Sequence, residues 1–288
     1  MKIKPMVLVL LLLGFSYLGG LIGVFVGHKQ LKESRVQRDR EERVGMDVLV
    51  PAFKLESLLV KKRSMLADGD SVSSLEPEIA TLLAQVTKAH SSFESVLVTQ
   101  ADKTVMNGAW DTVSKAVANT ESGTNEALIE LSTYQNIIGD ASDLIFDPEL
   151  DSYYLMSGLV LALPKLCDQV GRVELAFQKH SAEKNIVNRE ALLGELAKLQ
   201  VYEADLKSAV GTARNNVNQM KSEVKMSGVV TRLEKLEDTL FRFDKAAREG
   251  DSSLSSLRTE VLQASEALFV DMAGALNKLL EKRLARNA

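Results

Sequence analysis

The sequence predicts an all-α protein in which an N-terminal transmembrane helix is followed by an elongated antiparallel helical bundle. Residues 6–27 form a nearly uninterrupted apolar run. Downstream of this run, apolar residues recur in steps of three and four, and no segment reads as a convincing strand. The 288 residues include only 17 glycines and 5 prolines, a composition that suits long helices.

The first expected element is a membrane anchor over residues 6–27, preceded by a short cytoplasmic leader over residues 1–5. About 20 apolar residues cross the hydrocarbon core of a bilayer as a helix. A cleaved signal peptide is the rival interpretation, but its apolar region is usually shorter and ends at a small-x-small cleavage site, and none stands out here. We therefore expect an uncleaved anchor, with residues 28–288 forming the helical-bundle domain.

Beyond the anchor, the sequence predicts helix after helix. The first continues to about residue 67, and Pro51 predicts a kink or local break within it. The second follows a heptad pattern between Leu75 and Val96. The third covers about residues 102–146, and Ser122–Gly123 offers a point of interruption. The remaining helices are expected at about 147–180, 186–222, 228–248 and 253–286.

The expected architecture follows from the shape of these helices. Each carries one apolar stripe and one charged face, so each must bury its stripe against a neighbour. Short connections favour antiparallel neighbours, which gives a bundle. The first and third helices reach about 40 residues, or about 60 Å, whereas the others are shorter. This mismatch predicts two four-helix-bundle modules that are stacked end to end and share long helices, with a single up-down bundle as the alternative.

The composition argues against catalysis, cofactors and nucleic acid. The formal charge of -4 gives no net basic signal for nucleic-acid binding. No glycine-rich phosphate loop, nucleophile elbow or histidine-centred acid–base pair appears. Cys167 is the only cysteine, which excludes an intrachain disulfide and a cysteine zinc site, and the three histidines lie far apart. We expect no enzyme activity, no metal site and no cofactor.

The most informative helix begins near Asp147, which is a suitable N-cap, with Pro148 at the first helical position. Asp147, Glu149 and Asp151 superficially resemble a calcium loop, but the glycine and the twelfth-position glutamate of such a loop are missing. Tyr153 and Tyr154 follow on the same helix. One of them could line a ligand pocket between helices, and packing in the core is the alternative.

Five residues are the candidate ligand-binding residues of the sequence. Arg63, near the distal end of the first helix, could meet an anionic ligand, with a solvated helix face as the alternative. The others belong to the helix that begins near residue 147. The full set is Arg63, Asp147, Asp151, Tyr153 and Tyr154.

The run FDPELDSYYLM, followed by LPKLCDQVGRVE, resembles a segment of the helical sensor domains of methyl-accepting chemotaxis receptors and of related sensor kinases and diguanylate cyclases. Glu42, Gly45 and Pro51 resemble the start of such domains. Trp110 stands where the family often has a tryptophan, and KLLEKRLARN resembles the stretch that leads into its second membrane helix. Around Arg63 the chain lacks the histidine and glycine that the family often carries.

The resemblance implies an inner-membrane sensor whose body lies in the periplasm, binds a small molecule or a partner protein, and signals by a small displacement of its terminal helices. A homodimer that packs the first and last helices, or a partner receptor, is expected. By contrast, six basic residues lie between positions 29 and 43, and the positive-inside rule alone would leave the body in the cytoplasm. We expect export, as the resemblance implies.

The chain departs from the family at its end. It stops at Ala288 without a second apolar span, a HAMP-type linker or an output domain. We therefore expect a truncated receptor or a module that works through a partner, in either case without catalysis. The alternative function is a membrane-anchored structural or scaffolding bundle. A pore-forming helical toxin ranks third, because such proteins hide an apolar hairpin in the bundle and the long apolar run here is N-terminal.

Overall fold

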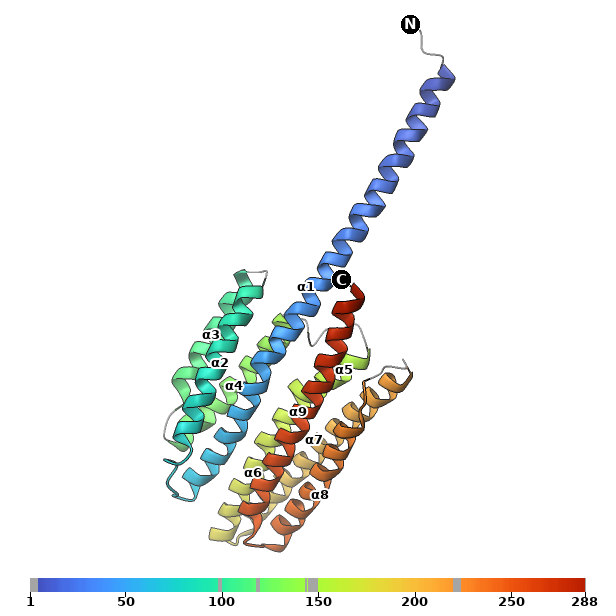
Figure 1. The fold of residues 1–288 in the computed structure, drawn as a ribbon. Helices are drawn as coiled ribbons and strands as arrows, with labels where there is room; N and C mark the ends of the chain where they lie inside the picture. Colours follow the sequence, from blue (N-terminus) through green and yellow to red (C-terminus); the bar gives the residue numbers. More distant parts are fainter. Residues whose placement is uncertain are drawn as a thin grey trace.

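The structure is a computed structural model that describes the backbone of residues 5–97, 100–117, 120–142, 144, 150–219 and 224–287. The side chains of residues 5–34, 100–101, 150–151 and 287 fall outside this description. Every regular element within the described ranges is helical, which confirms the all-α prediction (Figure 1). In chain order the elements are α1 (Pro5–Ala67), α2 (Glu76–Val96), α3 (Gln100–Ala116), α4 (Glu121–Ala141), α5 (Leu150–Met156), the π-helical turn η2 (Ser157–Ala162), α6 (Leu163–Ala182), α7 (Ile186–Gln219), α8 (Ser227–Glu249) and α9 (Leu254–Asn287).

Two predicted helices differ from the structure. Of the kink or local break predicted at Pro51, the break is wrong, because α1 runs through this residue without interruption. Packing against α2, α4, α6 and α9 supports α1 on several sides, which offsets the hydrogen bond that proline removes. The predicted third helix is two helices, α3 and α4. Thr120 caps α4, since its side-chain oxygen accepts a hydrogen bond from the Gly123 N–H at 3.0 Å.

Successive long helices run in opposite directions and form two four-helix bundles. In the first bundle, α1 pairs with α2 and α3 with α4. In the second bundle, the continuous α5–η2–α6 rod packs against α7, and α8 packs against α9. Two contacts show that α1 and α2 are antiparallel. Gln37, earlier in α1, donates a hydrogen bond to the carbonyl of Val96 at the end of α2, whereas Lys62, late in α1, pairs with Glu76 at the start of α2.

The two bundles lie side by side, and the end-to-end stacking predicted from the helix lengths is not found (Figure 1). Helix α1 packs lengthwise against α9, with the rings of Phe53 and Phe269 stacked at 4.2 Å between centroids. Farther along the same two helices, Arg43 of α1 forms an ion pair with Glu281, near the C-terminal end of α9. The prediction failed because α1 is buried on most of its circumference, so that it serves both bundles laterally.

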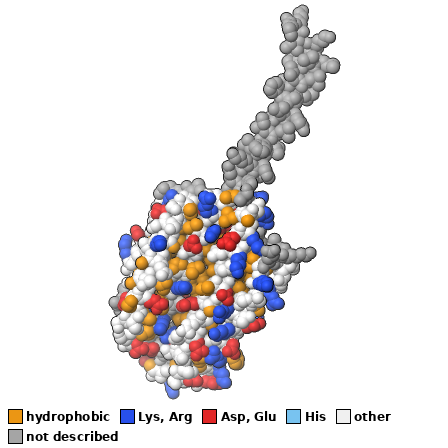
Figure 2. All heavy atoms as spheres, viewed as in Figure 1, with side chains coloured by type: hydrophobic (Ala, Val, Ile, Leu, Met, Phe, Trp, Pro, Cys, Tyr) orange, Lys and Arg blue, Asp and Glu red, His pale blue; other side chains and the backbone are white. Residues whose placement is uncertain are grey.

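The surface of the described body is mixed in charge. Figure 2 shows Lys and Arg side chains interspersed with Asp and Glu over the visible face, with hydrophobic side chains between them. The core below contains leucines, valines and alanines from all the helices, together with a few large aromatic rings such as those of Phe53 and Tyr134. This pattern is the one expected of amphipathic helices that bury one stripe each.

The membrane anchor predicted at residues 6–27 belongs to a segment whose side chains the structure does not describe. In the parts of the helices whose side chains the structure describes, no stretch is long and apolar enough to cross a membrane. The anchor therefore stays a prediction from the sequence.

Candidate functional site

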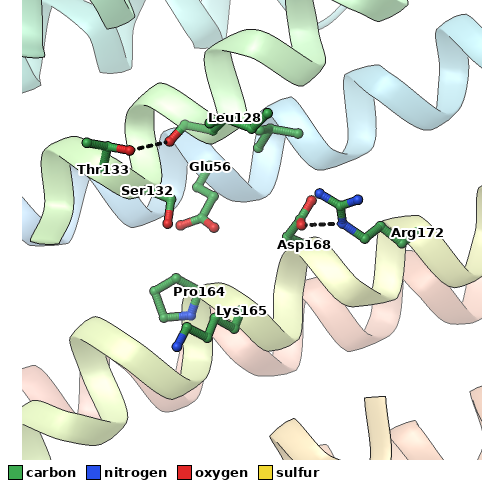
Figure 3. A pocket seen from close by; sticks show the side chains of 9 residues that line it. Glu56, Leu128, Ser132, Thr133, Pro164, Lys165, Asp168 and Arg172 are labelled. Carbon is green, nitrogen blue, oxygen red and sulfur yellow. Dashed lines mark hydrogen bonds and ion pairs between the residues drawn. The ribbon is translucent and has the colours of Figure 1, made fainter. Parts of the chain in front are cut away.

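A cavity of about 260 Å³ opens at the seam between the two bundles, and we call it the seam cavity (Figure 3). Helix α4 of the first bundle forms one wall, α6 of the second bundle forms the other, and α1 contributes one side chain between them. The lining combines apolar, hydroxyl and charged groups. Its residues are Glu56, Leu128, Ile129, Ser132, Thr133, Pro164, Lys165, Asp168 and Arg172.

A proline and a widened helical turn shape the α6 wall of the seam cavity. Pro164 has no N–H and its ring crowds the carbonyl one turn earlier, so a regular α-helix cannot run through it unchanged. The chain responds with the π-helical turn η2, in which the Leu163 N–H donates to the Gly158 carbonyl, five residues back. Such turns recur at functional sites, and here the proline that follows it lines the cavity.

Glu56 is the buried acid of the seam cavity. Its side chain is almost fully buried, and its Oε2 accepts a hydrogen bond from the Gln135 Nε2 at 3.0 Å. Burial raises the pKa of Glu56 to about 8, with a further upward contribution from the negative charge of Asp168 and opposing contributions from Gln135 and Arg63. At neutral pH the carboxyl is therefore mostly protonated and can donate a hydrogen bond.

A chain of ionic hydrogen bonds joins three helices beside the seam cavity. Asp168 accepts from the Arg63 Nη1 at 2.7 Å and from the Arg172 Nε at 2.6 Å. Arg63 also donates to the Asn125 Oδ1 at 3.2 Å and to the backbone carbonyl of Asp168 at 3.0 Å. The two guanidinium groups thus hold a single carboxylate at the cavity wall, where the dashed line of Figure 3 marks its contact with Arg172.

The solvated face considered for Arg63 is wrong, because this side chain is 1% exposed. It can cross to α6 because residue 171 is glycine. A Cβ at Gly171 would lie 2.4 Å from the Arg63 Nη2 and 2.8 Å from the Val60 Cγ1. Arg63 stands behind the cavity wall and does not line the cavity, so it acts there through Asp168. Its direct contact with a ligand stays a prediction.

The other predicted site residues lie away from the seam cavity or outside the described residues. Tyr153 is 38% exposed and Tyr154 packs partly against the core, with their rings edge to face at 5.1 Å. Neither tyrosine lines the seam cavity. Asp147 lies outside the described residues, and Asp151 belongs to α5 but its side chain is not described. Their ligand contacts stay predictions.

Residues from three of the sequence motifs that carry the family resemblance meet in a buried cluster near the C-terminal end of α9. The Arg283 guanidinium pairs with the Glu42 Oε2 at 3.2 Å and donates to the Ser152 hydroxyl. Glu42 comes from α1, Ser152 from the DSYY run and Arg283 from the KLLEKRLARN run. Close by, a Cβ at Gly45 would lie 2.6 Å from the Cβ of Ser142, so α1 and α4 need glycine there. These residues fasten the helices together.

Sequence reasoning missed four charged residues of the seam cavity. Glu56 sits among apolar neighbours in the run AFKLESLLV, and an acid on a buried stripe was the available signal. Lys165, Asp168 and Arg172 lie within LPKLCDQVGRVE, the run that carries part of the resemblance. Their spacing of three and four residues places them on one face of α6. The sequence did not show that this face meets α1.

No protein-family model matches the chain, and neither a curated protein nor a solved structure that matches it was found. Within the described residues, no group of three histidine, cysteine, aspartate or glutamate side chains is arranged to hold a metal ion. The functional argument consequently depends on the geometry of the chain itself.

Proposed function

We propose that the chain is a membrane-anchored sensor module of the chemoreceptor type, which binds a small ligand in the seam cavity without catalysing a reaction. The observation that carries this proposal is that Glu56 of α1 lies in the cavity wall between the two bundles. Helix α1 is a single helix from Pro5 to Ala67. A ligand that moves α1 relative to α4 and α6 would therefore act on the helix that continues into the apolar N-terminal run.

The charges of the seam cavity favour a small anion as the ligand. Glu56 is mostly neutral at neutral pH because burial raises its pKa to about 8. Asp168 is the remaining carboxylate, and it is shared by two guanidinium groups. Lys165 lies on the same wall, and its side chain makes no ion pair within the described residues. Two cationic groups of the lining, Lys165 and Arg172, with Arg63 directly behind the wall, stand against one ionised carboxylate and give the cavity a positive potential.

The remaining parts of the proposal concern placement and assembly. Residues 6–27 would anchor the chain in the inner membrane, with the bundle in the periplasm and the chain acting as a homodimer or with a partner receptor. To test the placement, alkaline phosphatase and a fluorescent protein that matures only in the cytoplasm are each fused after Ala288. Active phosphatase with a dark fluorophore supports the sensor. The reverse pattern contradicts it and leaves a cytoplasmic scaffold.

Ligand binding is tested on the full chain in lipid nanodiscs. Small carboxylates and phosphate esters are screened by the shift they cause in the thermal unfolding midpoint. A hit is repeated with Lys165→Gln, which removes the cation at the cavity, and with Lys88→Gln, which removes an exposed cation on α2. We expect the shift to be lost in the first variant and kept in the second. Hits that are indifferent to Lys165→Gln, or no hit at all, would argue against the seam cavity as the ligand site.

A structural or scaffolding bundle is the second candidate. It is favoured by large apolar side chains left on the surface of the second bundle, where Phe241 of α8 is 69% exposed and Val201 of α7 is 57% exposed. Side chains of this kind can serve as contacts for another protein. A cytoplasmic fusion result, together with a ligand screen without hits, would favour this candidate.

A further inference from the structure

A second cavity, of about 660 Å³, lies at the end of the second bundle farthest from the N-terminus of the chain (Figure 1). The end of α6, the turn that follows it, the start of α7 and the end of α8 surround it. We call it the tip cavity. Its volume falls within the range of about 300–1,000 Å³ that is usual for small-molecule sites. It shares no residue with the seam cavity.

One side of the tip cavity is apolar. Phe177 packs partly against the hydrophobic core and Leu192 is buried in it, so packing holds both side chains in place. Leu193, by contrast, keeps 40% of its surface exposed. A ligand with an apolar body would remove this exposed surface from water, which stabilises the complex in proportion to the apolar area covered.

The polar side of the tip cavity carries an excess of positive charge. The side chains of Lys184 and Arg189 are exposed and make no ion pair or hydrogen bond within the described residues. Arg248 is already neutralised, because its Nε and Nη2 donate to the carboxylate of Asp244 at 2.7 and 3.0 Å. The one acid of the lining, Glu249, lies 4.0 Å from a lysine Nζ. Two cationic groups therefore remain available to a ligand.

His180 adds a third polar feature. It lines the tip cavity, and its Nδ1 is buried without a hydrogen-bond partner among the described residues. A buried polar atom without a partner costs free energy, and a group that supplies the missing hydrogen bond recovers it. The histidine is therefore a further point at which a polar ligand would gain affinity.

We propose that the tip cavity binds a small organic carboxylate with an apolar body. The apolar body lies against Phe177, Leu192 and Leu193, and the carboxylate lies between Lys184 and Arg189. The guanidinium of Arg189 presents a planar pair of N–H donors that matches a carboxylate. This site goes beyond the proposed function, because the seam cavity can bind or fail to bind a ligand whatever happens at the tip.

The experiment measures binding of 4-phenylbutyrate to the full chain in nanodiscs by equilibrium dialysis, with empty nanodiscs subtracted. The neutral alcohol 4-phenylbutanol has the same apolar body without the charge. We expect saturable binding of the acid and at least about tenfold weaker binding of the alcohol, because a charge-assisted hydrogen bond contributes about that factor. Equal binding of the two compounds, or no saturable binding of the acid, would overturn the proposal.

Matched variants assign the binding to the tip cavity. The double variant Lys184→Gln with Arg189→Gln should weaken binding of 4-phenylbutyrate by about tenfold or more. Lys88→Gln with Lys278→Gln removes two exposed lysines elsewhere and should leave the affinity unchanged. Both double variants should keep the wild-type unfolding midpoint, since they replace exposed side chains. Wild-type affinity in the tip variant, or an equal loss in the control, would contradict the site.

A protein partner is the competing occupant of this end, since Ile186 and Val187 are 72% and 69% exposed on the first turn of α7. These two side chains do not line the tip cavity. Ile186→Ser with Val187→Ser should therefore leave the affinity for 4-phenylbutyrate unchanged. A loss as large as that of the charge variant would instead place the probe on an open apolar surface and refute the cavity.

Discussion

Replacing Glu56 by glutamine measures how much the burial of this carboxyl group between the two bundles lowers the stability of the fold when the carboxyl is ionised. The amide of Glu56→Gln has nearly the shape of the protonated carboxyl and can still accept the hydrogen bond from Gln135. It differs from the wild-type side chain in having no charge to bury. Any difference in stability that changes with pH therefore reports the titration of this one carboxyl.

The size of the effect follows from the two pKa values of Glu56. The carboxyl titrates near 4.5 in the unfolded chain and at about 8 in the folded one. Between these values the folded chain keeps a proton that the unfolded chain has released, so the wild type loses stability as the pH rises. At about 1.4 kcal/mol per pKa unit, the full loss is about 5 kcal/mol, and about 3 kcal/mol of it falls between about pH 5.5 and about pH 8.5.

The assay is thermal unfolding of the full chain in nanodiscs, followed by circular dichroism across this pH range. For a domain of this size, 1 kcal/mol moves the midpoint by about 2–4 °C, so the variant should gain about 6–12 °C over the wild type between the two pH limits. Glu78→Gln, on the exposed face of α2, is the control and should show no pH-dependent difference. A difference between Glu56→Gln and the wild type that stays constant with pH would refute the buried, protonated carboxyl.

Two further predictions concern packing and buried charge. Gly171→Ala places a Cβ 2.4 Å from the Arg63 Nη2 and should cost about 1–3 kcal/mol in urea unfolding, whereas Gly194→Ala, which meets nothing within 4 Å, should be neutral or stabilising. Equal effects of the two would contradict the close approach of α1 to α6. Glu174→Ala leaves the buried guanidinium of Arg258 without its partner at 2.6 Å and should cost about 3–5 kcal/mol. A loss below about 1 kcal/mol, the value of an exposed pair, would show that water reaches this pair.

The secondary structure was largely predictable because its signals are local. The spacing of apolar residues predicted the end of the first helix near residue 67 and helices close to α7, α8 and α9. Gly250, which follows the last residue of α8, has a φ of 76° and lies in the left-handed region that glycine tolerates. The interruption considered near Ser122–Gly123 lies close to the boundary that the structure places at Thr120, and threonine is a good N-cap.

The side-by-side arrangement was not predictable from single helices. Helix length suggested stacking, but length does not say how many faces of a helix are buried. On α1, polar residues at 42, 56, 62 and 63 look like a solvated face in the sequence, and the structure buries all four. Each has a hydrogen bond or ion pair to another helix. The residue pattern of one helix cannot show partners that come from four others, here α2, α4, α6 and α9.

The seam cavity was missed for the same reason. Its charged residues come from α1 and from the run LPKLCDQVGRVE, more than 100 residues apart in the chain. The sequence pointed instead to Tyr153 and Tyr154, whose rings contact each other near the surface of the second bundle. Among the predicted site residues that the structure describes, Arg63 is the one that lies beside the cavity, and its side chain is buried, contrary to the solvated alternative. Its contact with a ligand stays a prediction.

Buried ion pairs explain why the two bundles hold one register. Apolar stripes tolerate a slide of one helical turn, because leucine and valine replace one another at similar cost. A slide of about 5.4 Å would instead separate every buried pair and leave its charges desolvated, at a cost of several kcal/mol for each. Two such pairs cross the seam, Glu42 with Arg283 and Arg63 with Asp168. A third buried pair, Glu174 with Arg258, fixes the register of α6 and α9 within the second bundle. Arg63 joins both walls of the seam cavity, because it contacts Asp168 of α6 and Asn125 of α4, so one of the charges that set the register also supports the site.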